Sequence, residues 1–299
     1  MRRLLLSFAT LAACALAPAA QAELYYVIIA GLGGEKRYEE AFAEQVTKLT
    51  EVARRSTSAD RVKVLAGPNA TRDNLAAALA ELETRTRPTD SLALIMIGHG
   101  SFDGERYKLN LPGPDIDAES LAEMLSRVPA RSQLVVNTSS ASGEIIAPLK
   151  AEGRTVITAT RNGRERNATR FGSFFAAALS ENAADINKNG IITAQEAFDF
   201  TERSVADSFK DAGALATEHP QLVGDDAERF TLARLQAQRE PATPVLAELE
   251  RKKAGIEEQI EALRLRRDEL GAAYFTELEK LLVELAEVQE QIDSQSTPQ

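Results

Sequence analysis

The strongest constraint on the fold is a continuous apolar run, Ser91–Ile97, that ends abruptly in the sequence Gly98-His99-Gly100. Polar and apolar residues do not alternate in this run, so it predicts a strand buried on both faces of a parallel sheet. Residues at the carboxyl end of such a strand stand where open α/β sheets bind ligands. His99 is therefore either a functional residue or a hydrogen-bonded surface histidine, and the glycines beside it allow close backbone approach.

Four further apolar runs alternate with amphipathic segments along the first 160 residues. The additional strands are expected at 24–30, 61–66, 133–137 and 155–160, and the helices at 36–54, 73–86, 118–127 and 144–151. This alternation predicts an α/β fold with a mostly parallel sheet and helices on both faces. Residues 107–111 predict a small added strand or hairpin after the histidine.

The strand at 133–137 leads into a turn of small residues, Thr138-Ser139-Ser140-Ala141-Ser142-Gly143, in which a nucleophile would stand exposed. A strand ending in His-Gly, then a helix, then a strand ending in Cys-x-Ser-Gly is the arrangement of the caspase, legumain and gingipain cysteine peptidases. The chain resembles this group over residues 24–230. The stretch 26–34, with Tyr38 after it, is similar to the legumain branch in particular.

The resemblance implies a caspase-like fold in which His99 acts as base or acid and residue 140 attacks a peptide carbonyl. The backbone N–H groups of Gly100 and Ser140 would hold the oxyanion. Two departures affect this expectation. Ser140 stands where the family has its cysteine, and Gly33 stands where legumain has an asparagine that helps to orient the histidine.

The change to serine leaves three functions open. A hydroxyl needs more general-base help than a thiol, and serine triads supply it through a carboxylate on the histidine. The sequence shows no obvious carboxylate for this role; Asp103 is close in sequence, but the sequence does not place it. We favour a pseudo-peptidase that binds peptide or protein partners. The alternatives are a peptidase or hydrolase using Ser140 and His99, and a coiled-coil adaptor or structural protein.

The loop at 161–167 is dense in charged and amide side chains. In the related peptidases the segment after this strand helps to wall the substrate pocket, and by position this loop would do the same here. The other interpretation is a solvated surface loop, since charged loops are common at surfaces.

Residues 185–196 match the calcium-binding loop of an EF-hand position by position, with helical patterns on both sides. The expected metal ligands are Asp185, Asn187, Asn189, the carbonyl of Ile191 and Glu196. Only the first and last carry full charge, so we expect weak calcium binding. The alternative is an empty loop that keeps its shape through its own hydrogen bonds.

The first 22 residues read as a secretory signal peptide, with Arg2 and Arg3, an apolar stretch and an Ala20-Gln21-Ala22 cleavage site. The stretch is too short for a membrane span. We favour this cleavage over lipidation of Cys14, the chain's single cysteine, and expect a bacterial protein that is periplasmic or secreted. Formal net charge is −10, which argues against a nucleic-acid partner.

After an α/β domain over residues 23–235, Pro241 and Pro244 predict a linker, and residues 245–292 predict a helical coiled-coil tail. Apolar positions recur at intervals of three and four, and the register slips across Gly271–Tyr274. A slip at a glycine favours a helical hairpin. A single long dimeric coiled coil is the alternative, and either arrangement allows self-association.

Overall fold

The computed structural model describes residues 22–181, 183–235 and 244–296. The chain divides into two compact units, one ending at Ala237 and one beginning at Gln238. The predicted signal peptide, the possible lipidation site Cys14 and the linker residue Pro241 lie outside the described residues, apart from Ala22. Within the described ranges, no helix combines the length and apolar character needed to cross a membrane.

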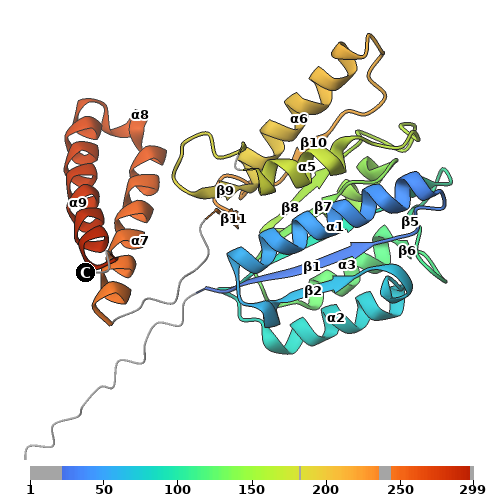
Figure 1. Ribbon diagram of the computed structural model, residues 1–299, viewed down its shortest axis with the longest axis horizontal. Coiled ribbons are helices and arrows are strands. Elements are labelled where there is room, and N and C mark those ends of the chain that lie inside the picture. Colours follow the sequence, from blue (N-terminus) through green and yellow to red (C-terminus); the bar gives the residue numbers. More distant parts are fainter. Residues whose placement is uncertain (1–21, 182, 236–243, 297–299) are drawn as a thin grey trace, which may run out of the picture. The chain divides into compact units, whose positions relative to one another are not determined.

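The first unit contains a six-stranded sheet in the order β10-β8-β7-β3-β1-β2 (Figure 1). Its strands are β1 (Leu24–Ala30), β2 (Val62–Leu65), β3 (Ser91–Ile97), β7 (Ser132–Asn137), β8 (Arg154–Thr158) and β10 (Gln221–Val223). All neighbouring strands pair in parallel except β10, which is antiparallel to β8. The predicted α/β class with a mostly parallel sheet is confirmed.

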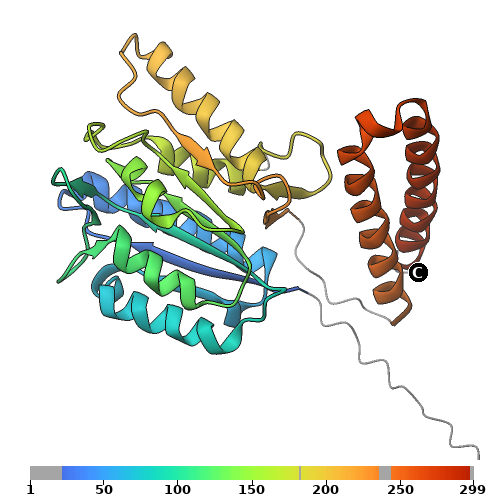
Figure 2. The same cartoon turned by 180° about the vertical axis from the view of Figure 1, so that it is seen from behind.

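Helices cover both faces of this sheet, as Figures 1 and 2 show from opposite sides. One face carries α1 (Lys36–Ser56), α5 (Phe171–Ser180) and α6 (Ala194–Asp211), and the other carries α2 (Arg72–Arg85), α3 (Ala118–Arg127) and α4 (Ile146–Leu149). In β1, Tyr26 and Ile28 face the first group of helices, whereas Tyr25 and Val27 face the second. Burial on both faces is why the strands read as unbroken apolar runs.

The segment expected to be a helix at 144–151 is shorter and tighter than the periodicity suggests. A 3₁₀ turn, η3 (Ser142–Ile145), leads into the single helical turn α4, which ends at Leu149. Pro148 has no backbone N–H, so an α-helix that began at residue 144 would lack the hydrogen bond from residue 148 to residue 144.

Two small sheets accompany the main one. After β3 the chain forms β4 (Gly100–Phe102), β5 (Tyr107–Leu109) and β6 (Ile116–Asp117), a three-stranded antiparallel sheet. The predicted added strand at 107–111 corresponds to β5. The other sheet pairs β9 (Ile191–Thr193) with β11 (Thr231–Arg234) and anchors the EF-hand-like loop.

The second unit is helical, with α7 (Pro244–Leu265), a short α8 (Arg267–Leu270) and α9 (Ala272–Ser296). Helices α7 and α9 pack side by side and bury Ile256, Ile260 and Val288. Gly271, at φ +55°, separates α8 from α9 where the sequence register slips. The coiled-coil assignment of residues 245–292, and self-association through it, stay predictions.

Candidate functional site

The carboxyl ends of β1 and β3 bring two of the predicted residues together. From β1 the chain moves outward to β2, whereas from β3 it moves the other way to β7 and β8. Ligands of open α/β sheets bind at such a change of direction. Gly33 follows β1 and His99 follows β3, and the Gly33 carbonyl oxygen lies 3.1 Å from Nε2 of His99.

This contact decides which nitrogen of the His99 ring carries the proton. A carbonyl oxygen only accepts, so Nε2 donates and Nδ1 of the neutral ring keeps its lone pair. Among the described residues, no group forms a hydrogen bond with Nδ1 of His99. The ring is held between aromatic side chains, with its centroid 4.7 Å from that of Tyr38 and 5.3 Å from that of Phe42. His99 is thus oriented by a carbonyl and two rings, and no described carboxylate contacts it.

Gly33 has no room for a side chain. A Cβ at this position would stand 2.5 Å from the backbone nitrogen of Glu39 and 2.9 Å from its Cα, both at the start of α1. The asparagine expected from the legumain resemblance therefore does not fit here, and the backbone carbonyl at position 33 contacts the histidine instead.

The turn after β7 places Ser140 against the first residue of β4. The Ser140 hydroxyl donates to the carbonyl oxygen of Gly100 at 2.9 Å, and the Gly100 N–H points to Ser140 Oγ at 3.4 Å. The Ser140 side chain is engaged with this peptide, and no hydrogen bond joins it to His99 among the described residues. A Cβ on Gly100 would stand 2.3 Å from the Ser140 carbonyl oxygen, so the contact requires glycine.

A series of hydrogen bonds, each with a defined donor, stabilises the turn after β7. Asn137 donates through Nδ2 to the Tyr107 hydroxyl at 2.8 Å, and that hydroxyl lies 2.7 Å from Ser139 Oγ. Ser139 Oγ in turn donates to the Ser140 carbonyl oxygen at 3.1 Å. Because each hydroxyl has one proton, Tyr107 must donate to Ser139. Tyr107 and Asn137 were not predicted as site residues, because their roles depend on hydrogen bonds between β5 and the end of β7.

Ala141 follows Ser140 in the left-handed region, at φ +56°, although it is not glycine. Such a conformation costs an L-residue about 1 kcal/mol or more. Nearby hydrogen bonds hold it: the Ala141 N–H donates to the Glu165 carbonyl at 2.8 Å, and the hydroxyls of Ser142 and Thr160 lie 3.1 Å apart. Strained backbone of this kind is found at functional sites, where surrounding contacts enforce it.

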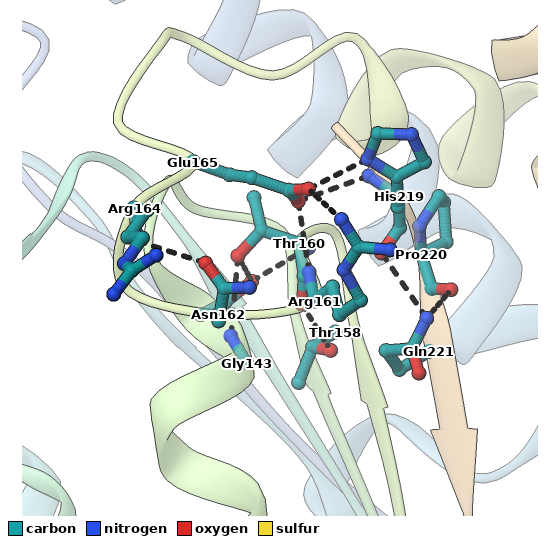
Figure 3. Close-up of polar contacts among 11 residues, drawn as sticks. Gly143, Thr158, Thr160, Arg161, Asn162, Arg164, Glu165, His219, Pro220 and Gln221 are labelled. Carbon is teal, nitrogen blue, oxygen red and sulfur yellow. Dashed lines mark hydrogen bonds and ion pairs between the residues drawn. The ribbon is translucent and has the colours of Figure 1, made fainter. Parts of the chain in front are cut away.

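The loop at 161–167 is fastened to this turn and to the segment before β10, as Figure 3 shows. The Glu165 carboxylate accepts from the Arg161 N–H at 2.9 Å, the His219 N–H at 3.1 Å and Nδ1 of His219 at 2.6 Å. On the other side, the Gly163 N–H donates to the Glu144 carboxylate at 2.6 Å. The loop is thus anchored beside the Ser140 turn. The sequence indicated its charge, but not the pairing with His219, which is 54 residues away.

Glu218 is a buried carboxyl next to this loop, 3% exposed. Burial raises its pKa to about 7, against the opposing effect of the Arg170 N–H, while the negative charge of Glu165 raises it further. Both carboxyl oxygens accept from that N–H, at 2.8 and 3.0 Å. Sequence reasoning did not single out Glu218, since no local pattern marks a buried carboxyl.

The EF-hand-like loop is closed by hydrogen bonds among the residues predicted to bind calcium. The Asp185 carboxylate accepts from the N–H groups of Asn189 and Gly190, at 3.1 and 3.0 Å, and Asn187 donates through Nδ2 to the Glu196 carboxylate at 2.9 Å. Oxygen-bearing side chains at the predicted positions therefore lie close together. Glu196 also caps α6 through Thr193. Within the described residues, no group of three or more His, Cys, Asp or Glu side chains is arranged so that it could hold a metal ion.

No family model matches the chain, and no curated protein does. A solved structure similar to it is that of protein GSU0716 from Geobacter sulfurreducens, which is 11% identical with a TM-score of 0.47. The match covers 73% of this chain and 100% of that one. A likeness of this size carries no argument about the function of the site.

Proposed function

We propose that residues 23–235 form a caspase- or legumain-like domain of an exported protein, which binds peptide or protein segments without cleaving them. The resemblance of the His-Gly strand and the Ser140 turn to that peptidase group supports this proposal. So does the position of both segments at the carboxyl ends of adjacent parallel strands, β3 and β7. Ala141 in this turn has a left-handed backbone, at φ +56°, which is strained for a residue other than glycine and is typical of functional sites.

The proposal that the domain does not cleave peptides rests on the direction in which the Ser140 hydroxyl donates its hydrogen bond. Its proton points to the Gly100 carbonyl, whereas a nucleophilic serine must give its proton to a base. Serine triads also stabilise the imidazolium through a carboxylate, and among the described residues no carboxylate is hydrogen-bonded to His99, whose ring contacts the Gly33 carbonyl, Tyr38 and Phe42. Ser140 is also a poorer nucleophile than the cysteine of the related peptidases.

A specific observation favours the second candidate, a serine peptidase or hydrolase. Nδ1 of His99 has no partner in the described part of the chain, and Gly100 presents its N–H toward Ser140. Rotation of the Ser140 side chain away from the Gly100 carbonyl would be needed before His99 could act as its base.

One set of variants tests these proposals. Without the leader the chain has no cysteine, since Cys14 is the only one, so Ser140→Cys creates a single-thiol protein. The chain from Glu23 onward is incubated with a pool of peptides, and cleavage is followed by mass spectrometry. We expect no cleavage by the native protein and slow cleavage by Ser140→Cys, because a thiolate needs less help from a base.

The control is Ser140→Cys combined with His99→Ala, which should lose the gained activity. Cleavage by the native protein that disappears in Ser140→Ala would establish the serine enzyme instead. Cleavage that survives Ser140→Ala would point to neither candidate.

A calcium ion is proposed separately for the loop at 185–196. The support is the twelve-residue pattern, the proximity of Asn187 to Glu196, and Gly190 at φ +79°, where the EF-hand turn needs glycine. Oxygens of residues 185, 187, 189, 191 and 196 would hold the ion, which would stabilise the connection from α5 to α6.

A further inference from the structure

Two backbone N–H groups next to the Ser140 hydroxyl have a weak partner or none. The Gly100 N–H is 3.4 Å from Ser140 Oγ, longer than the usual separation of about 2.9–3.0 Å. No acceptor for the Ser140 N–H occurs in the described part of the chain, although this residue is only 4% exposed. Buried N–H groups in native proteins are nearly always paired, so these two donors call for an acceptor from outside the chain.

The donors are within reach of the surface. The residues His99 and Gly100 are both partly exposed. The hydroxyl that now occupies the Gly100 N–H is on a rotatable side chain, and a stronger acceptor would displace it.

A positive charge lies along the same strand edge. Gly100 begins β4 and Phe102 ends it. Arg166 donates through Nε to the Gly163 carbonyl at 3.2 Å and through Nη2 to the Phe102 carbonyl at 3.5 Å. Among the described residues no carboxylate pairs with this guanidinium, although the chain has a formal net charge of −10.

We propose that this site binds a carboxylate of a peptide ligand, with the N–H groups of Gly100 and Ser140 as donors and Arg166 as the nearby positive charge. The inference rests on the proposed function, that the domain binds peptides without cleaving them. Two adjacent backbone donors match the two oxygens of a carboxylate, as in backbone sites that capture the C-terminus of a peptide. In a domain that does not cleave peptides, the N–H groups that would stabilise a transient oxyanion during cleavage would instead bind a carboxylate of the ligand.

The test uses the mature chain, Glu23 to Gln299, immobilised and exposed to pools of randomised hexapeptides. The pools are a free-acid pool, the same pool with an amidated C-terminus, and an amidated pool with aspartate as the last residue. We expect at least tenfold more retention of the free-acid pool than of the amidated pool, since a charged hydrogen bond is worth about a factor of ten or more. Equal retention of the aspartate pool would identify side-chain carboxylates as the ligand.

Variants locate the binding. Ser140→Asp brings its own carboxylate to the donors and should abolish retention of the free-acid pool. Ser140→Ala removes the competing hydroxyl and should increase retention. Arg166→Gln should reduce it by up to about fivefold, the size of a partly exposed ionic contact, while Arg54→Gln, exposed on α1, should not. Circular dichroism checks that each variant is folded.

The outcomes separate the two proposals. Equal retention of free-acid and amidated pools, or full retention by Ser140→Asp, would overturn the carboxylate site and leave peptide binding intact. Retention of no pool at all would overturn both proposals.

Discussion

The Ser140 hydroxyl donates a hydrogen bond to the Gly100 carbonyl oxygen, 2.9 Å away. The bond joins the turn after β7 to the strand that follows His99, and Gly100 permits it because any side chain there would meet the Ser140 carbonyl. A hydroxyl used in this way fixes the two turns relative to each other. It also directs the proton away from a base, which is the basis for proposing binding without cleavage.

The first prediction concerns the hydrogen-bond chain below this turn. Tyr107→Phe removes the hydroxyl that accepts from Asn137 and donates to Ser139, leaving a buried amide donor unpaired. The free energy of unfolding should fall by about 1–3 kcal/mol, measured by urea denaturation. The control is Tyr25→Phe, because the Tyr25 hydroxyl makes only a 3.5 Å contact with a carbonyl. An equal fall in the free energy of unfolding in the two variants would show that the hydrogen bonds of Tyr107 make no specific contribution.

The second prediction is a pH dependence of stability from Glu218. Burial raises its pKa from 4.5 to about 7, so the folded protein holds this proton more tightly than the unfolded chain does. The contribution of Glu218 to the free energy of unfolding is therefore fully present below about pH 4.5 and is lost as the pH rises through about 7. At about 1.4 kcal/mol for each pKa unit, the loss is at most about 3 kcal/mol.

Glu218→Gln should remove this loss, because the amide does not ionise and its oxygen still accepts from the Arg170 N–H. Urea denaturation at pH 5 and pH 8 measures the difference, with Glu152→Gln as an exposed control. If Glu218→Gln keeps the full pH dependence of the native protein, another group is responsible.

The third prediction concerns calcium. With a dissociation constant of about 10⁻⁴–10⁻³ M, calcium at about 10 mM should raise the melting temperature by roughly 3–8 °C. Glu196→Gln should remove most of this shift because it deletes the closing carboxylate. It also weakens the cap on α6, so the shift on adding calcium is compared, not the melting temperature itself. Glu202→Gln, exposed on the same helix, is the control, and no shift in the native protein would reject the site.

The fourth prediction is that a chain ending at Glu240 folds without its tail. The chain forms one compact unit up to Ala237 and another from Gln238, and apolar residues of α7 and α9 pack on each other. The truncated chain should show cooperative unfolding at nearly the native midpoint. Failure to fold would mean that the tail completes the core of the α/β unit.

The main sheet was predictable because burial on both faces leaves a strong local signal. The runs at 24–30 and 91–97 coincide with β1 and β3, and the others differ from β2, β7 and β8 by one or two residues at their ends. β10 was not predicted, because three half-buried residues at the edge of a sheet carry no distinctive pattern. The turn at 142–149 was misjudged as a longer helix because Pro148 and the strained Ala141 act locally against the periodicity.

The candidate site was predictable only where it follows from strand ends. Parallel strands bring their carboxyl ends to one edge, which placed His99 and the Ser140 turn together. The direction of the Ser140 hydroxyl, the role of Tyr107 and the pairing of Glu165 with His219 depend on contacts between residues 30 or more positions apart. The hydrophobic periodicity of a sequence does not indicate such long-range contacts.

The measurement that tests the central claim most directly is labelling by a serine-reactive phosphonate. The chain from Glu23 onward is incubated with the reagent and its intact mass is measured, with a known serine protease as positive control. The account predicts no adduct on Ser140, because its hydroxyl donates its proton to the Gly100 carbonyl and no described carboxylate forms a hydrogen bond with His99. One phosphonyl adduct on Ser140 that disappears in His99→Ala would contradict the account and establish a serine nucleophile.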